Sequence, residues 1–337
     1  MSKLRKRGSV VGTIIKVVML IALIIVLGFI QNNWVFNTNY IFEDVDVPKN
    51  FIGYKIVQIS DIMNNPMNTL DTVDKQSPNL ILITGNLSDT NGNADKSIEL
   101  IKQLSKRYDT FYVLGETDSN PENINAKLEG TNALNIEDTC IEMTGIERTS
   151  EEFINKYIES WYLKDRDNPD SEIAKYIEYT IAELEKDKEA KIEVYGTSLL
   201  EADEDYLSHI YNNVNLDSNN YKILVANQGQ YISNLANIEV DALLTGNTFG
   251  IDRFNTGYRR GIYFKENTII SVSGGIGSNP DGGFRILNTP QVITITLSDG
   301  TINNKNPLEK LLDRIIPDFG TRFDNDEGFS EYTYNYD

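Results

Sequence analysis

The chain is nearly devoid of the two residue types that most often bind transition metals. Its 337 residues include one histidine and one cysteine, His209 and Cys140. A single cysteine excludes an internal disulfide, and a single histidine excludes a histidine-rich metal centre. Basic residues are also scarce, because 31 Lys and Arg stand against 50 Asp and Glu, which gives a formal net charge of −19.

The few basic residues are unevenly placed. Five of the 31 precede position 17, where no acidic residue occurs: Lys3, Arg5, Lys6, Arg7 and Lys16. The remaining 26 basic and 50 acidic residues give the rest of the chain a charge of −24. A domain this acidic repels nucleic acid and anionic lipid headgroups, so we expect no nucleic-acid partner.

One long apolar run follows the basic cluster. Val10–Ile30 contains a single charge and exceeds the about 20 residues that a membrane-spanning helix needs. No basic residue follows the run before Lys49, so the positive-inside rule predicts a cytoplasmic N-terminus and an extracytoplasmic main domain. The alternative is a cleaved signal peptide, but no small-x-small pattern follows the run, and Trp34 and Phe36 are typical of an interfacial aromatic belt. We therefore predict that residues 1–36 form a basic flank and a single anchor in the cell membrane.

The rest of the chain alternates short apolar runs with segments of helical periodicity. Near-continuous apolar runs separated by helices indicate parallel βαβ units. After Tyr258 the pattern changes to short strands with little helix, which favours a layered α/β sandwich over residues 37–300. The expected strands are 54–60, 80–84, 110–114, 221–226, 240–245, 261–264, 268–273 and 291–297, and the expected helices are 68–76 and 94–107.

Two segments depart from this pattern. Residues 150–190 are charged and amphipathic, and we expect a two-helix insertion broken near Pro169. This insertion is either a helical hairpin packed on the core or a device that binds a protein partner. In the tail 301–337, we expect a short amphipathic stretch at Leu308–Ile316 and then a disordered end that is acidic and rich in tyrosine.

Polar residues follow five of the expected strands. Taken singly, each is an ordinary turn, because Gly, Asn and Asp dominate turns. In open α/β sheets, however, ligand sites lie beyond the carboxyl ends of the strands, so the ordered set predicts a common site. The set comprises Asp61, Gly85-Asn86, Gly115-Glu116, Asn227 and Gly246-Asn247.

This ordered set resembles the calcineurin-like metallophosphoesterases, especially their membrane-anchored bacterial branch. The family pattern is Asp-x-His, Gly-Asp-x-x-Asp, Gly-Asn-His-Asp/Glu, a lone His after a strand, and Gly-His-x-His. The strands 54–61 and 78–85 and the motif Gly246-x-Thr-x-Gly250 look like the family framework, and segments 273–277 and 284–290 resemble its closing strands. The resemblance covers residues 50–298 outside the insertion and implies the family's α/β sandwich after one transmembrane helix.

The chemistry that the resemblance implies is not carried over intact. Family members hold two divalent metals, bridged by the Asp of the second motif, and these metals activate water and stabilise phosphate charge. Asp61 keeps the first ligand, but Met63 stands in place of a histidine and Asn86 in place of the bridging carboxylate. Asp89 and Asp118 persist at positions that orient neighbouring groups in the family.

The remaining family histidines are also absent. Glu116 stands where the family has Asn, and Thr117 stands where the family has the histidine that assists phosphate chemistry. Asn227, Asn247 and Phe249 replace three histidine ligands. The resemblance therefore implies the fold without the metal centre.

No other catalytic device takes the place of the metals. Cys140 has no neighbouring base in the sequence, and His209 lies outside all five motifs. Neither a nucleophile elbow nor a phosphate-binding Gly-rich loop with Lys-Ser/Thr occurs. The leading interpretation is an inactive pseudo-phosphoesterase that binds or organises a partner at the cell envelope. The alternatives are a metal-dependent phosphoesterase with an atypical or residual site, and a protein that holds a phosphate-bearing envelope ligand without cleaving it.

The same positions limit the cofactors. We expect no catalytic metal and no organic cofactor. At most, a weak calcium or magnesium ion is compatible with the oxygen-rich set Asp61, Asn86, Glu116, Asn227 and Asn247, because hard cations take oxygen ligands.

Overall fold

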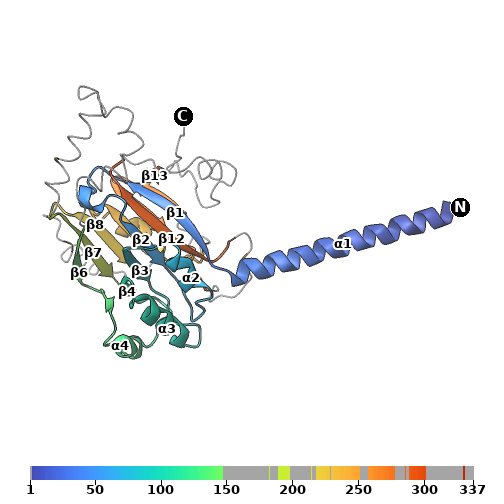
Figure 1. The fold of residues 1–337 in the computed structure, drawn as a ribbon, viewed down its shortest axis with the longest axis horizontal. Helices are drawn as coiled ribbons and strands as arrows, with labels where there is room; N and C mark the ends of the chain where they lie inside the picture. Colours follow the sequence, from blue (N-terminus) through green and yellow to red (C-terminus); the bar gives the residue numbers. More distant parts are fainter. Residues whose placement is uncertain are drawn as a thin grey trace, which may run out of the picture.

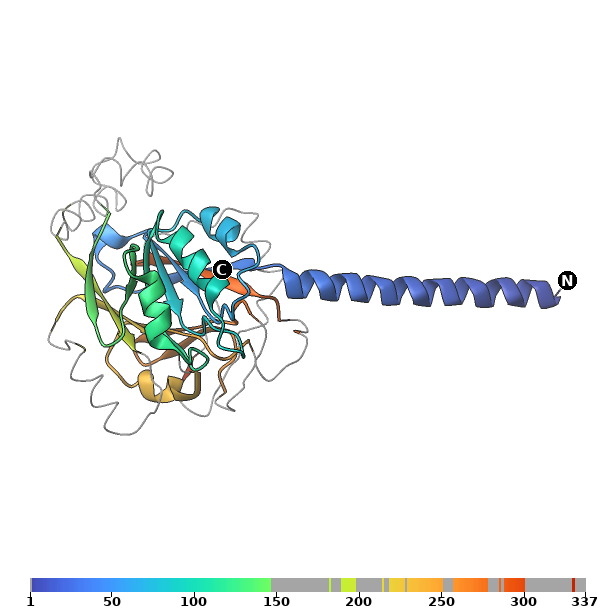
Figure 2. The ribbon, with the colours of Figure 1, turned by 90° about the horizontal axis from the view of Figure 1, so that it is seen from below.

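The computed structural model describes residues 2–146, 189–197, 218–227, 229–250, 257–277 and 288–300, together with 182, 214, 285 and 329–330. These residues form an α/β domain of two packed sheets, and a long helix projects from it (Figure 1, Figure 2).

The first sheet has the strand order β1-β12-β2-β3-β4-β5. Strands β2 to β5 run parallel to one another. Strand β12 is antiparallel to β2, and β1 is parallel to β12, so these two strands run against the other four. The bounds are β1 (Phe36–Glu43), β12 (Gln291–Ser298), β2 (Lys55–Ile59), β3 (Leu80–Thr84), β4 (Asp109–Val113) and β5 (Ala133–Asn135).

The second sheet has the order β13-β10-β11-β9-β8-β7-β6. Its centre is parallel, from β7 through β8 and β9 to β11, whereas β6 and β10 pair antiparallel with their neighbours. The pair Thr144–Lys191 of β6 and β7 brings the two ends of the intervening segment together. The bounds are β13 (Phe329–Ser330), β10 (Gly261–Lys265), β11 (Thr268–Val272), β9 (Ala242–Thr245), β8 (Tyr221–Ala226), β7 (Lys191–Thr197) and β6 (Cys140–Thr144).

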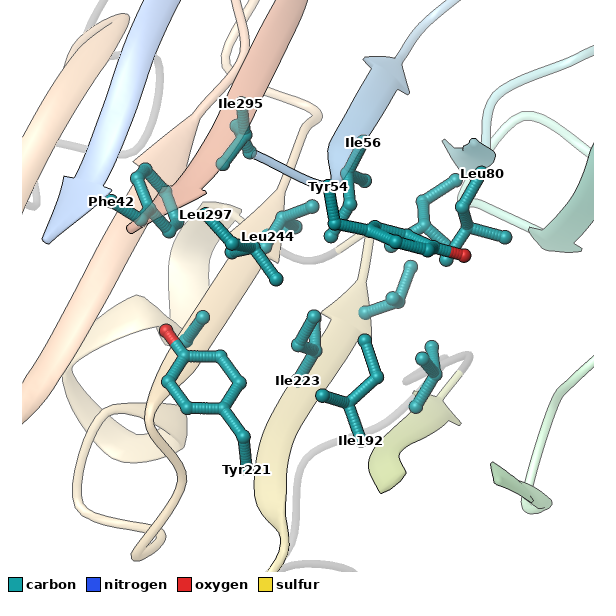
Figure 3. Packing of buried hydrophobic residues seen from close by; sticks show 14 of the residues in the cluster. Phe42, Tyr54, Ile56, Leu80, Ile192, Tyr221, Ile223, Leu244, Ile295 and Leu297 are labelled. Atoms are coloured by element: carbon teal, nitrogen blue, oxygen red, sulfur yellow. The ribbon is translucent and has the colours of Figure 1, made fainter. Parts of the chain in front are cut away.

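The main core lies between the two sheets. Alternate side chains of a strand point to opposite faces, so in β3 Leu80 and Leu82 face the second sheet, while Ile81 and Ile83 face the helices. Figure 3 shows Leu80 on the side of the first sheet and Ile192 and Ile223 on the side of the second. Full burial of one such side chain contributes about 1.5–3 kcal/mol to folding.

Helices cover the outer faces of both sheets. The first sheet carries α2 (Thr69–Asp74), α3 (Asp95–Leu104) and α4 (Pro121–Leu128), and the second carries α9 (Ile232–Leu235). Short 3₁₀ turns occur at Lys49–Phe51 and Gly229–Tyr231. In α3 the apolar residues recur at helical spacing, so one face is buried while the other carries charge. This layering confirms the predicted α/β sandwich.

The expected strands occur within one or two residues of their predicted bounds. The two expected helices begin within one residue of the prediction, but α2 ends two residues early and α3 ends three residues early. Seven further helices and strands were not predicted, namely β1, α4, β5, β6, β7, α9 and β13. The predicted closing strands are corrected in part, because Ser273–Gly277 is a bend rather than a strand, and β12 begins only at Gln291. The predicted helices of residues 150–190, the tail 301–337 apart from β13, and His209 lie outside the described residues.

The N-terminal helix α1 (Ser2–Asn33) projects away from the domain and lies along the longest axis of the molecule (Figure 1, Figure 2). Its side chains are described for residues 12–23, 25, 26, 28 and 33. Within the described part of the chain, no helix combines the length and the apolar character needed to cross a membrane. The transmembrane anchor therefore stays a prediction.

Candidate functional site

Three strand ends from both sheets meet in a buried hydrogen-bonded cluster. Asp61 follows β2, Asn86 follows β3 and Asn247 follows β9, and all three side chains are fully buried. Asn86 Nδ2 donates to Asp61 Oδ1 at 2.8 Å and to Asn247 Oδ1 at 3.0 Å. The backbone N–H of Asn247 donates to both carboxylate oxygens of Asp61, at 3.1 Å each. The carboxyl ends of the parallel strands in the two sheets thus share one edge of the molecule.

Two further predicted positions connect this cluster to the surface. Asn247 Nδ2 donates to Glu116 Oε2 at 2.9 Å, and Glu116 is exposed. The backbone N–H of Glu116 donates to Asn227 Oδ1 at 3.3 Å, and Asn227 Nδ2 donates to the carbonyl of Thr84 at the end of β3. We call Asp61, Asn86, Glu116, Asn227 and Asn247 the strand-end network.

The donor direction within the network is set by a backbone group. The N–H of Thr117 can only donate, and it donates to Asn86 Oδ1 at 3.0 Å. The Thr117 hydroxyl lies 3.2 Å from the same oxygen. Because the amide oxygen of Asn86 faces Thr117, its NH₂ group must face Asp61 and Asn247. The amides of Asn86 and Asn247 therefore donate toward carboxylates at opposite ends of the network, the buried Asp61 and the exposed Glu116.

The two aspartates Asp89 and Asp118, which match the family pattern, organise loops. Asp118 is buried, and its carboxylate accepts from the backbone N–H groups of Leu87, Ser88 and Gly115 at 3.2, 2.7 and 2.9 Å. Burial raises the pKa of Asp118, although these backbone hydrogen bonds oppose the rise. Asp89 accepts within its own turn and from Asn64 Nδ2 at 3.3 Å. Neither carboxylate has a described hydrogen bond to the strand-end network.

Two large apolar side chains stand at positions where the family that the sequence resembles has histidines. Met63 and Phe249 are 7% and 1% exposed, and both have left-handed backbone, with φ of 52° and 51°. Such a conformation is uncommon for a bulky residue and stores strain of order 1–3 kcal/mol. The sulfur of Met63 accepts from the Thr117 hydroxyl at 3.7 Å. These side chains contribute packing and one weak acceptor to the site.

Two glycines allow the backbone to approach the network closely. A Cβ at Gly275 would lie 2.6 Å from Asp61 Oδ2, and its φ of +68° also favours glycine. A Cβ at Gly115 would lie 2.5 Å from Asn86 Oδ1. The bend after β11 therefore lies directly against Asp61.

Burial makes the charge of Asp61 costly. Burial raises the pKa of Asp61 to about 6, against hydrogen bonds from the Asn86 side chain and the Asn247 backbone N–H and the charge of Arg285. Burial lowers the pKa of Arg285 to about 10, while Asp61 opposes this shift. The Arg285 guanidinium donates to the carbonyls of Gly274, Gly275 and Gly277 around Asp61.

Sequence reasoning did not single out Arg285 or Gln58 as site residues. Gln58 is fully buried in β2, where its Nε2 donates to Thr245 O at 2.8 Å and its Oε1 accepts from the Ser271 hydroxyl at 2.6 Å. It therefore ties the first sheet to β9 and β11 just below the network. The available signals were a glutamine inside an apolar strand and an arginine beside a glycine-rich bend.

The donor set does not fit the two-metal centre that the resemblance implies. Within the described ranges, no group of three or more His, Cys, Asp or Glu side chains gathers so as to hold a metal ion. Asn86 presents an NH₂ group, rather than oxygen, between Asp61 and Asn247. A cation there would have to displace these donors, so we derive no metal-dependent step.

Cys140 lies on the exposed surface of β6, opposite Tyr195 of β7. Burial, together with Glu193 and Glu142, raises the pKa of its thiol, against a hydrogen bond with Tyr195. A reactive cysteine needs a lowered pKa, so Cys140 is not poised as a nucleophile.

Comparison with known proteins assigns no family. No protein-family model matches the chain. No curated protein matches it either. The crystal structure of TT1561 of Thermus thermophilus is similar at a TM-score of 0.41 and 12% identity, over 66% of this chain and 89% of that one. A second crystal structure is similar at 0.40 and 11%, over 66% and 91%. Likenesses this distant do not identify a family.

Proposed function

We propose that this chain is a membrane-anchored, extracytoplasmic relative of the calcineurin-like phosphoesterases that has lost catalysis and acts by binding a partner. The family relation is supported by the order of the five strand-end positions along the chain. It is supported further by their hydrogen bonding to one another at one edge of two packed sheets.

The observation that carries the loss of catalysis is the orientation of Asn86. Two-metal hydrolysis needs an anionic oxygen that bridges the cations and holds them close together. Here the bridging position carries an amide NH₂, whose direction is set by the Thr117 backbone N–H. The NH₂ protons of Asn86 already point at the oxygens of Asp61 and Asn247 that a cation would need as ligands. The hydrogen-bonding groups of the cluster thus pair with one another without a metal.

The membrane anchor is supported by α1. Ten apolar side chains between Ile14 and Val26 are each at least half exposed. Exposed apolar side chains in such number favour burial against protein or lipid, and α1 extends away from the domain (Figure 2). The basic residues before the apolar run favour a cytoplasmic N-terminus.

A binding role is supported by the site's exposed end and by the insertion. Glu116 carries the network to the surface, so a ligand or partner can be sensed there. The segment between Thr144 and Lys191 starts and ends on paired strands, which would hold a partner-binding insertion at a defined place. No nucleic-acid role is proposed, because the domain is strongly acidic.

Enzyme assay tests the loss of catalysis. The full chain in detergent is offered a phosphomonoester and a phosphodiester with manganese, zinc, iron or magnesium, and we expect no turnover above the blank. Asp61→Asn, which keeps the side-chain shape, and Asp109→Asn, an exposed acid at the start of β4, serve as matched variants. Metal-dependent turnover that is lost in Asp61→Asn but kept in Asp109→Asn would establish an atypical hydrolase instead.

Protease added to intact spheroplasts tests the topology. We expect digestion of the domain after Trp34 and retention of the N-terminal fragment in the membrane fraction. Complete protection of the domain, with digestion only after lysis, would contradict the proposed orientation.

A further inference from the structure

The direction of β1 places the exit of α1 at the same edge as the strand-end network. Strand β1 is parallel to β12, which is antiparallel to β2. The start of β1 therefore lies level with the carboxyl ends of β2, β3 and β4, where the network lies. In Figure 1, α1 joins the domain at the start of β1 and beside α2.

Hydrogen bonds trace this proximity residue by residue. The N–H of Phe36 donates to Pro290 O at 2.9 Å, and Phe36 pairs with Gln291. The N–H of Gln291 donates to Gly275 O at 3.1 Å. Gly275 in turn packs directly against Asp61. Only the backbone of residues 290–291 and the bend at Gly275 therefore lie between the base of α1 and the buried carboxylate of Asp61.

The connection between α1 and the domain is clamped. Only Trp34 and Val35 separate the last helical residue from β1. Val35 is 1% exposed and packs in the core, and its N–H donates to Asn68 Oδ1 at 2.8 Å. Asn68 Nδ2 and the Thr72 hydroxyl both donate back to Val35 O, at 3.3 and 3.4 Å. Both backbone polar groups of Val35 are therefore bound to Asn68 and Thr72, which restricts rotation of the link.

The two residues that flank this clamp suit a bilayer interface. Trp34 and Phe36 are 55% and 43% exposed on either side of the buried Val35. Aromatic rings gather at the headgroup level of membranes, because one part of the ring system is apolar and another tolerates water. The clamp would then lie at the level of the lipid headgroups.

We propose that the network-bearing edge of the domain faces a layer of zwitterionic lipid headgroups and that the Val35 clamp holds it there. This inference rests on the proposed anchoring by α1. The orientation comes from the clamp and not from charge attraction, because the rest of the chain carries −24 and anionic lipid repels it. A ligand that reaches Glu116 then arrives along the membrane surface. The exposed carboxylate favours an ammonium or hydroxyl group in that ligand over a bare phosphate.

Fluorescence quenching in vesicles tests the orientation. In a Cys140→Ser background, the full chain receives one new cysteine, either Ser119→Cys beyond the carboxyl end of β4 or Asp109→Cys at its amino end. Both positions are exposed. The two labels lie at opposite ends of β4, whose five residues rise about 3.3 Å each, so they are roughly 15 Å or more apart. The probe is a vesicle of phosphatidylcholine that contains a lipid with a spin-labelled headgroup.

We expect the label at position 119 to be quenched several-fold more strongly than the label at position 109. Equal quenching, or stronger quenching at position 109, overturns the proposed orientation while the chain still floats with the vesicles. Loss of flotation overturns the anchor itself, which separates the failure of the proposed function from that of the orientation.

A double variant, Asn68→Ala with Thr72→Val, tests the clamp. It should leave flotation intact and bring the quenching of the two labels toward equality, since the link can then swivel. The far-ultraviolet spectrum shows whether the domain remains folded. A quenching difference that persists in the folded double variant overturns the clamp as the orienting element.

Discussion

Replacement of Asn86 by aspartate tests the direction of the strand-end network. Asn86→Asp changes one NH₂ group into oxygen and so restores the carboxylate that the phosphoesterase resemblance expects at this position. In the structure that NH₂ group faces Asp61 Oδ1 at 2.8 Å and Asn247 Oδ1 at 3.0 Å. After the substitution, two hydrogen bonds become contacts between oxygens inside a fully buried cluster.

The size of the effect follows from these contacts. Each buried partner left unsatisfied costs about 1–3 kcal/mol, so the loss of both bonds costs roughly 2–6 kcal/mol. Two carboxylates this close cannot both ionise, so one takes up a proton and recovers one of the two bonds. We therefore expect destabilisation of about 3 kcal/mol near neutral pH, or a fall of roughly 6–12 °C in melting temperature for a domain of this size.

The proton also makes the effect depend on pH. Because the folded variant binds a proton that the unfolded chain releases near neutral pH, its deficit relative to the parent chain should shrink between about pH 7 and pH 5. Denaturant titration at the two pH values measures this. Asn79→Asp is the matched control, because Asn79 uses its side-chain oxygen to accept from the Lys55 N–H and should tolerate the exchange. An Asn86→Asp variant as stable as the parent near neutral pH, without added metal, would refute the donor direction.

Three other substitutions probe the same edge. Relative to the parent chain, the free energy of unfolding of Asp61→Asn should rise by up to about 3 kcal/mol as the pH goes from about 4 to about 7. The reason is that the folded pKa of Asp61, raised from 3.8 to about 6, gives the parent stability that is present below about pH 4 and lost as the pH rises through 6. A difference by denaturant titration that does not change with pH contradicts this. Gly275→Ala should lower the stability by more than Gly130→Ala, for which we expect a loss of about 1 kcal/mol. Both glycines have positive φ, but a Cβ at Gly130 would meet no atom within 4 Å. Equal shifts in melting temperature would contradict the close approach of Gly275 to Asp61. Asn68→Ala should lower the stability by about 1–3 kcal/mol by calorimetry, because the buried Val35 N–H loses its acceptor, and no change would contradict the clamp.

The fold was largely predictable where strands are apolar on both faces. β3 has the sequence Leu-Ile-Leu-Ile-Thr, and both of its faces are covered, one by the second sheet and one by helices. β1 escaped prediction because Phe36–Glu43 contains three consecutive polar residues, Asn37, Thr38 and Asn39, and is largely half-buried, which resembles a linker after an anchor. Its partner β12 lies more than 250 residues away in the chain, so local pattern could not indicate the pairing.

The residues of the candidate site could be predicted from the sequence, but their hydrogen bonds could not. The five polar positions were predicted because each follows an expected strand, and parallel strands of one sheet end at the same edge. The sequence could not show that Thr117 sets the direction of the Asn86 amide, since that depends on one backbone N–H. Nor could it show that Gln58 joins the two sheets below the site, because a buried glutamine needs partners from distant strands.

The backbone of the site explains which side chains occupy it with little strain. Asp61, Asn86 and Asn247 have φ of 50°, 57° and 61°, in the left-handed region that Asp and Asn tolerate best after glycine. An exchange among Asp, Asn and His at such positions changes the chemistry while it leaves the backbone intact. Met63 and Phe249 share the same backbone without that tolerance, so their burial must offset the strain. The backbone at Asp61, Asn86 and Asn247 can therefore accommodate any of these polar side chains, and here they form a buried hydrogen-bonded cluster at one edge of the two sheets.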